Sequence, residues 1–210
     1  MKREDLEHII RASGDVLGES EVIIVGSQAI LGAPYEDLPK DVTLSVEVDV
    51  IATHDLDGNK ALRLNGAIGE MTRFDEMFGY YAEGVEEGLC RFPERWRERL
   101  LPVETPATNG VTGLCVEPHD LCASKLLAGR DKDLKYVASL LRSGHVKVEV
   151  LIERLQTTDA TADEFERVIG FFERTTHPAT NSPARRALRK ARSHLASTRS
   201  AKGPSGGLPS

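Results

Sequence analysis

The chain has 210 residues, a formal net charge of −6 and 40% hydrophobic residues, which suits one globular core or a core with a small appendage. No apolar run reaches the length of a membrane span, and the first ten residues lack a signal-peptide layout, so we expect a soluble, cytoplasmic protein. Three cysteines without metal-ligand spacing indicate reduced thiols rather than a zinc site or a disulfide framework.

The first predicted elements are a helix and a short strand. Apolar residues recur at helical spacing between residues 5 and 16, and the β-branched run at residues 21–25 predicts a strand. Gly26 then allows a ligand to approach the backbone closely, and Ser27 is placed to cap a brief helical segment at residues 28–31. Free N–H groups at this turn would face an anion such as a triphosphate.

The next predicted strand, at residues 44–51, alternates apolar and polar residues in the pattern of a half-buried strand. A period of two places Glu47 and Asp49 on one face, about 7 Å apart, where their like charges repel. A divalent cation such as Mg²⁺ would offset this repulsion, because it prefers carboxylate oxygens. The alternative is an ordinary strand whose polar face lies in water.

Further predicted elements complete an α+β half. Residues 53–70 predict a turn into a short helix, and residues 78–85 predict a strand in which Glu83 is a candidate third carboxylate. A solvated strand end explains Glu83 equally well. Another strand is expected from about Arg99, and the last one at residues 111–117.

From residue 117 the pattern predicts helices. Lys125 shares the inward side of the first helix, which Gly129 ends, and Asp133 leans toward the packed side of the next helix. Arg130 lies between them. An isolated charged residue on such a face commonly extends to water, but two at one helix junction indicate part of a pocket.

Apolar stripes at residues 148–155 and 165–172 predict two more helices. Residues 181–210 carry seven basic side chains and no acidic one, so the preceding 180 residues hold −13 of charge. A basic end on an acidic body favours contact with a polyanion such as nucleic acid. The alternative is a disordered, solubilising terminus, which the Gly, Pro and Ser content of the last ten residues favours.

Two motifs resemble known families. A strand, a Gly-Ser loop, a short helix and a strand with an acidic, apolar, acidic order resemble the nucleotidyltransferase superfamily related to DNA polymerase β. Residues 120–134 (DLCASKLLAGRDKDL) resemble the pattern D-L-x-x-x-K-L-x-A-x-R-x-K-D-L of bacterial nucleotidyltransferase-like proteins of the AbiEii/MenT toxin type. Together the matching region spans about residues 22–141.

The resemblance implies roles for the first group of candidate residues. Glu47 and Asp49 would bind Mg²⁺ or Mn²⁺, while Gly26 and Ser27 would hold the phosphates of an NTP. The sequence departs from the superfamily at Glu47, where Asp is commoner. Glutamate still offers carboxylate oxygens to the metal ion.

The resemblance also implies roles in the helical half. In the toxin-type family the matching lysine contacts nucleotide phosphates and the downstream aspartate supports the active site, so Lys125 and Asp133 inherit these catalytic roles. Arg130 would offset negative charge as pyrophosphate leaves.

We therefore expect an α+β protein with a polymerase β-like nucleotidyltransferase core (a mixed sheet with flanking helices) at residues 1–116. A helical subdomain would follow at 117–178 and a disordered basic tail at 179–210. The expected activity is transfer of a nucleoside monophosphate from an NTP to an acceptor. The resemblance implies RNA, in particular the 3′ end of a tRNA, as the acceptor, and a cognate antitoxin as a partner.

Two alternatives to this function stay open. The acceptor is a protein or a small molecule in one of them. In the other, the chain is a catalytically inactive nucleotidyltransferase fold that serves as a binding module.

Overall fold

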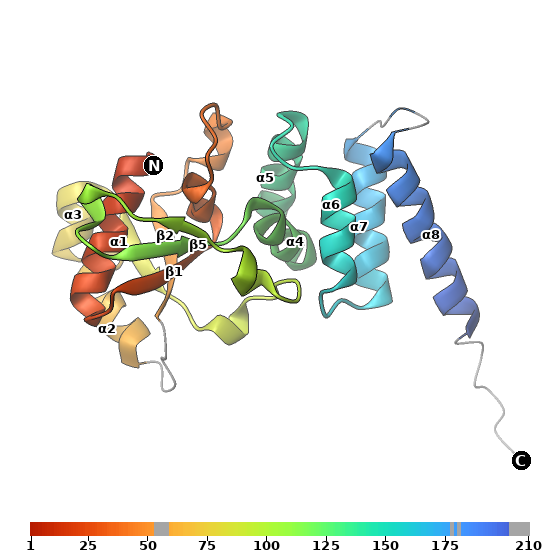
Figure 1. Cartoon of the computed structure of the whole chain (residues 1–210). Coiled ribbons are helices and arrows are strands. Elements are labelled where there is room, and N and C mark those ends of the chain that lie inside the picture. Colours follow the sequence, from red (N-terminus) through yellow and green to blue (C-terminus); the bar gives the residue numbers. More distant parts are fainter. Residues whose placement is uncertain (53–58, 177–178, 180–181, 202–210) are drawn as a thin grey trace, which may run out of the picture.

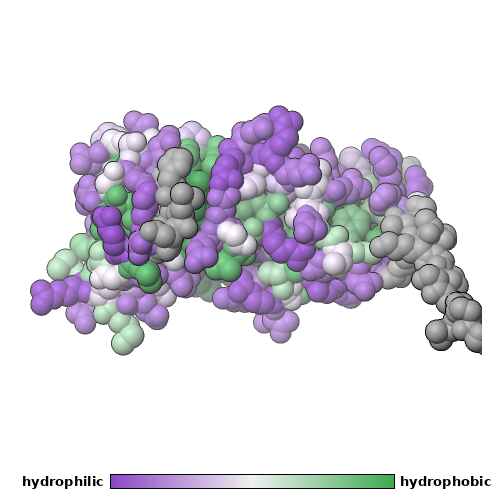
Figure 2. All heavy atoms as spheres, turned by 90° about the horizontal axis from the view of Figure 1, so that it is seen from below, coloured by the Kyte–Doolittle hydropathy of each residue, from purple (hydrophilic) through white to green (hydrophobic). Residues whose placement is uncertain are grey.

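The computed structural model describes residues 1–52, 59–176, 179 and 182–201. A five-stranded sheet with its covering helices lies at one end of the molecule, and the later helices follow one another away from it (Figure 1). Among the described residues no helix is both long and apolar enough to cross a membrane. The face seen in Figure 2 is mainly hydrophilic.

The sheet is mixed, with strand order β3-β2-β1-β5-β4. The central strand β1 pairs antiparallel with β2 and parallel with β5, while β2–β3 is parallel and β4–β5 is antiparallel. The expected α+β class with a mixed sheet is therefore confirmed. The strands are β1 Glu21–Val25, β2 Glu47–Ala52, β3 Tyr81–Gly84, β4 Leu101–Val103 and β5 Thr112–Cys115.

Helices α1 (Arg3–Leu17) and α2 (Asn59–Ile68) pack on each other and on the sheet. The predicted apolar stripe of α1 supplies Leu6, Ile9 and Ile10 to the core, where all three are fully buried. This packing holds β1 and β2 rigidly, so their ends can position side chains for a site.

Strand β2 begins later than predicted, at Glu47. Residues 44–46 precede the sheet, and Leu44 and Val46 are 73% and 46% exposed despite their apolar character. Strand β2 begins at Glu47 because its pairing with β3 starts there, where Glu47 lies opposite Tyr81.

Strand β3 is also shorter than predicted. Residues 73–78 form helix α3 (Arg73–Phe78), which Thr72 caps by accepting a hydrogen bond from the Asp75 N–H. Gly79 ends this helix with a φ of 72°. The strand therefore begins at Tyr81, and the predicted residues before it belong to the helix and its turn.

The helical half begins directly after the sheet and continues its core. Gly129, which has a φ of 66°, terminates helix α4 as predicted, and α7 opens with a capping box formed by Thr161 and Glu164. The helices are α4 Pro118–Ala128, α5 Asp131–Arg142, α6 Val148–Gln156 and α7 Ala162–Thr175.

The prediction of a disordered tail is wrong for residues 183–201, which form helix α8 (Pro183–Ala201). Leu188, Ala191 and Leu195 are buried, and α8 packs against α6 and α7. The helix owes its order to this tertiary contact, because its apolar stripe is narrow and most of its remaining side chains are basic or polar.

Candidate active site

Three carboxylates gather at one place on the sheet. Glu47 and Asp49 lie on β2 as predicted, and the parallel register places Glu83 of β3 opposite Asp49. The three side chains each offer an oxygen, and these oxygens all lie within 4.8 Å of one another. Glu83, for which the sequence left two explanations open, therefore belongs to the cluster.

Interactions within the cluster raise the pKa values of Asp49 and Glu83. Burial, followed by the charge of Glu47, raises the pKa of Asp49 to about 6. A hydrogen bond with Glu47, burial and the charges of both neighbours raise the pKa of Glu83 to about 7. The cluster thus resists carrying its full negative charge unless a positive charge lies nearby.

This donor set fits a divalent cation. Mg²⁺ takes oxygen ligands at about 2.0–2.1 Å in octahedral geometry, which spaces ligand oxygens about 3 to 4 Å apart. Oxygens of Glu47, Asp49 and Glu83 within 4.8 Å of one another approach that spacing after small side-chain rotations. Carboxylate oxygens also suit Mn²⁺.

Gly26 lies directly against the carboxylate cluster. Its φ is 66°, and a Cβ atom there would come within 1.6 Å of Asp49 Oδ2. Both the backbone conformation and the close approach therefore require glycine. The loop leads into a short 3₁₀ helix, Ser27–Gly32.

Ser27 has a different role from the predicted cap. Its hydroxyl accepts a hydrogen bond from Lys125 Nζ at 3.1 Å, and no side-chain cap bond forms at the start of the following turn. Its carbonyl accepts a hydrogen bond from the Tyr136 hydroxyl at 2.7 Å. The loop is thus joined to α4 and α5, about a hundred residues further along the chain.

Lys125 is buried although it carries a charge. Its Nζ donates to Asp133 Oδ1 at 3.2 Å as well as to Ser27, and it lies 4.6 Å from the centre of the Tyr136 ring. The structure therefore places Lys125 between the Gly-Ser loop and the second helix of the predicted junction.

Asp133 holds two cations. Arg130 Nε donates to its Oδ2 at 2.5 Å, while Lys125 donates to Oδ1. Burial alone would raise the pKa of Asp133, but the hydrogen bonds with Arg130 and Lys125 outweigh it and lower the pKa. Asp133 is therefore ionised at neutral pH and orients both basic side chains.

A cavity of about 450 Å³ brings most of these groups together, while Glu83 lies outside its described lining. Six of the seven residues predicted from the sequence line it: Gly26, Ser27, Glu47, Asp49, Lys125 and Arg130. The seventh, Asp133, lines an adjoining cavity of about 420 Å³ that shares Ser27 and Lys125 with the first. The volume suits a nucleotide-sized ligand.

The cavity has features that the sequence analysis did not assign. Lys132 adds a cation, although it lies inside the motif that contained Lys125 and Asp133. Val85, Leu89 and Phe92 form an apolar wall. These residues come from the irregular segment after β3, where no periodic pattern marks a buried face.

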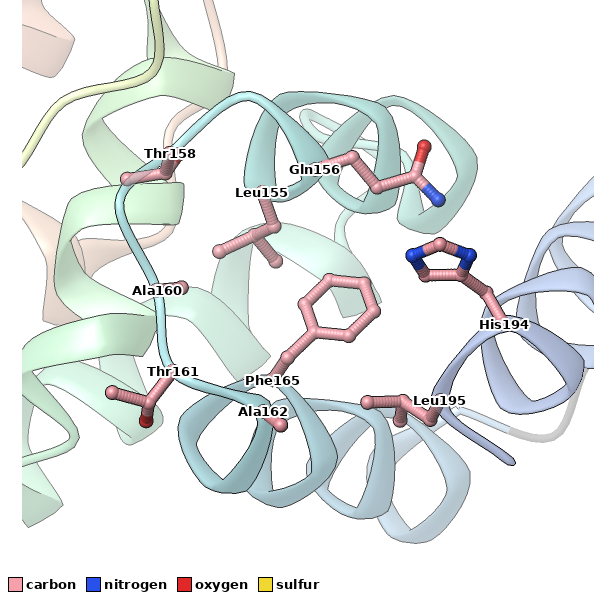
Figure 3. Close-up of a pocket in the computed structure, with 9 residues that line it drawn as sticks. All are labelled: Leu155, Gln156, Thr158, Ala160, Thr161, Ala162, Phe165, His194 and Leu195. Carbon is pink, nitrogen blue, oxygen red and sulfur yellow. The ribbon is translucent and has the colours of Figure 1, made fainter. Parts of the chain in front are cut away.

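A slightly larger cavity, of about 480 Å³, lies between α6, α7 and α8 (Figure 3). Phe165, Leu155 and Leu195 form its apolar part, with Gln156 and His194 beside them. Its described lining holds no carboxylate, lysine or arginine. The chemistry therefore favours the smaller cavity beside the carboxylates as the candidate active site.

The mixed sheet, the Gly-Ser loop and the carboxylates on adjacent strands together define a nucleotidyltransferase-like protein. Residues 4–171 match the family described as "Nucleotidyltransferase of unknown function (DUF6036)", and the chain belongs to that family. No curated protein and no solved structure matches the chain. The superfamily resemblance is thus supported, while the toxin type stays a prediction.

Proposed function

We propose that the protein is a metal-dependent nucleotidyltransferase that moves a nucleoside monophosphate from an NTP to an acceptor and releases pyrophosphate. The observation that carries this proposal is the convergence of Glu47, Asp49, the Gly-Ser loop and Lys125 on one cavity, with Glu83 completing the carboxylate cluster beside it. Each group suits a different part of a metal–nucleotide complex.

The three carboxylates would hold Mg²⁺ or Mn²⁺. When bound, the ion would neutralise phosphate charge and make the acceptor oxygen more nucleophilic. Gly26 leaves space for Asp49 beside the loop, so the backbone and the carboxylate can both approach the phosphates. Val85, Leu89 and Phe92 line the same cavity and would offer apolar contact to a bound nucleotide.

Lys125 is suited to the phosphates. An ammonium group has three N–H donors, and hydrogen bonds to Ser27 and Asp133 use two of them. A third donor is left for a phosphate oxygen. Arg130 is 62% exposed at the edge of the cavity, where it would meet charge on the departing pyrophosphate.

We further propose RNA, in particular the 3′ end of a tRNA, as the acceptor, and a cognate antitoxin as the partner of a toxin. The resemblance of residues 120–134 to toxin-type proteins supports this proposal. Incubation with each labelled NTP and total RNA tests it. Label on protein or on a small molecule would identify another acceptor, and metal-dependent NTP binding without transfer would identify a binding module.

The metal site is tested with Asp49→Asn. Metal-dependent NTP binding should weaken at least about tenfold, because a ligand is lost from a small donor set. Stability in metal-free buffer should stay equal or rise, since repulsion within the cluster decreases. Calorimetry and chemical unfolding measure the two effects. Glu86→Gln, which removes an exposed acid outside the cluster, is the matched control.

Equal metal and NTP affinity in the wild type and Asp49→Asn would refute the proposed metal site. Loss of binding in Glu86→Gln as well would show that general negative charge, rather than the cluster, attracts the ion.

The loop is tested by comparing Gly26→Ala with Gly18→Ala. Both glycines have positive φ, at 66° and 71°, so each alanine should cost about 1–2 kcal/mol of backbone strain. A Cβ at Gly18 meets nothing within 4 Å, whereas one at Gly26 displaces the Asp49 carboxylate. We expect metal-dependent NTP binding to be lost in Gly26→Ala alone. Unchanged binding would mean that the loop does not shape the site.

A further inference from the structure

Helix α8 carries a concentrated positive charge. Its 19 residues include six basic side chains and no acidic one: Arg185, Arg186, Arg189, Lys190, Arg192 and Arg199. Arg185 and Arg189, like Arg186 and Lys190, are four residues apart, and all four are exposed. Like charges at this spacing destabilise a helix, so the arrangement indicates a surface that meets negative charge.

The packing of α8 on the protein leaves these four basic side chains on the outer face of the helix. Leu188, Ala191 and Leu195 face α6 and α7, and Arg192 donates hydrogen bonds to Glu173 at 2.6 and 3.1 Å. The apolar face of α8 is thus used within the protein. A helix that binds a membrane surface needs such a face for the bilayer, so this packing disfavours a lipid partner.

Three arginines also share a depression of about 400 Å³ beside α8. Arg185, Arg189 and Arg192 line it together with Glu173 and Leu188. The guanidinium group of Arg192 is already paired with the Glu173 carboxylate, and this hydrogen bond lowers the pKa of Glu173. The remaining positive charge suits phosphate, which guanidinium groups bind with paired hydrogen bonds.

We propose that the exposed basic face of α8 docks the phosphodiester backbone of RNA. This inference rests on the proposed function for the identity of the polyanion. Residues 1–180 carry −13 of charge and would repel RNA, so binding requires a compensating surface. Helix α8 lies at the opposite end of the molecule from the sheet and beyond the residues that match the family, so it would hold a long acceptor far from its reacting end (Figure 1).

The test is fluorescence anisotropy with a labelled single-stranded RNA of about 20 nucleotides, without NTP or Mg²⁺, between about 50 and 200 mM salt. The variant is Arg185→Gln with Arg189→Gln and Lys190→Gln, because glutamine retains helix propensity. Each phosphate contact contributes about −0.7 to the slope of log affinity against log salt. Removing three contacts should make the slope shallower by about 2 and weaken binding at low salt at least about tenfold.

The matched control removes three exposed arginines outside α8: Arg11→Gln with Arg73→Gln and Arg142→Gln. It changes net charge equally and should leave the slope nearly unchanged. Arg185→Lys with Arg189→Lys should also retain the wild-type slope, since it keeps the charges. An unchanged slope in the α8 variant, or an equal change in the control, would overturn the inference.

Two further measurements separate this inference from the proposed chemistry. Asp49→Asn should bind RNA like the wild type, and the α8 variant should retain metal-dependent NTP binding. Failure of NTP binding with intact, α8-dependent RNA binding would refute the chemistry alone. If the α8 variant lost affinity for phosphatidylserine vesicles but not for RNA, the surface would belong to a membrane and the RNA assignment would be wrong.

Discussion

Two buried aspartates of the helical half have similar surroundings but different positions. Asp120 near the start of α4 and Asp133 near the start of α5 each hold two basic side chains. Arg99 and Arg154 hold Asp120 between the segment before β4 and helix α6. Of the described residues that line the carboxylate cavity, none belongs to the Asp120 network, whereas both partners of Asp133 line it.

The pKa directions differ accordingly. For Asp120, burial raises the pKa in spite of the hydrogen bond and charge of Arg99. For Asp133, the hydrogen bonds and charges of its partners outweigh burial and lower the pKa. The comparison teaches that a buried ion pair is not evidence of a site by itself. Its position relative to the cavity separates a positioning residue from an architectural one.

The largest expected effect is on Asp120. Asp120→Ala leaves two mostly buried guanidinium groups without their carboxylate and should lower the free energy of unfolding by about 3 kcal/mol. Chemical denaturation measures this loss. The control Asp131→Ala removes an exposed acid from the first turn of α5 and should cost less than about 1 kcal/mol. Equal losses of stability in the two variants would contradict the structural role assigned to Asp120.

A substitution of Lys125 tests the second aspartate of the comparison, Asp133. In Lys125→Met, Asp133 keeps Arg130, so the unfolding free energy should fall by only about 1–2 kcal/mol while nucleotide transfer is lost. Denaturation and a transfer assay measure the two effects. A stability loss as large as that of Asp120→Ala, restored by Lys125→Met with Asp133→Leu, would instead make this pair architectural.

The smallest effect on stability is expected for an ion pair near the surface, Arg91–Glu164, which serves as the reference for the two buried pairs. Arg91 donates to Glu164 at 2.7 Å, and this bond is the main reason that the pKa of Glu164 falls to about 2 from its usual 4.5. Because the folded pKa is the lower one, the pair stabilises the protein above about pH 4.5, and this contribution disappears as the pH falls toward 2.

Because the Glu164 pair is partly exposed to solvent, it should contribute less than about 1 kcal/mol. Unfolding of the wild type and Glu164→Gln between about pH 6 and pH 3 measures it, and glutamine preserves the capping box with Thr161. The stability difference should shrink with falling pH. A constant difference would show that packing, rather than charge, connects Arg91 to α7.

Local pattern alone predicted much of this protein. The two-residue period places Glu47 and Asp49 on one face, and the β-branched run before Gly26-Ser27 predicts the strand that leads into this loop. Helix α4 ends at Gly129, and α7 begins with its capping box, as their sequences indicate. These features depend on backbone geometry within a few residues, so the order of the residues is sufficient to predict them.

The tertiary structure decided what depends on distant segments. Glu83 joins the carboxylates because β3 pairs with β2 in one register, and Lys125 meets Ser27 across 98 positions of the chain. Helix α8 is ordered because Leu188 and its neighbours find a partner surface on α6 and α7. Register and packing arise from the summed burial of many residues from different elements, and no local period encodes that sum.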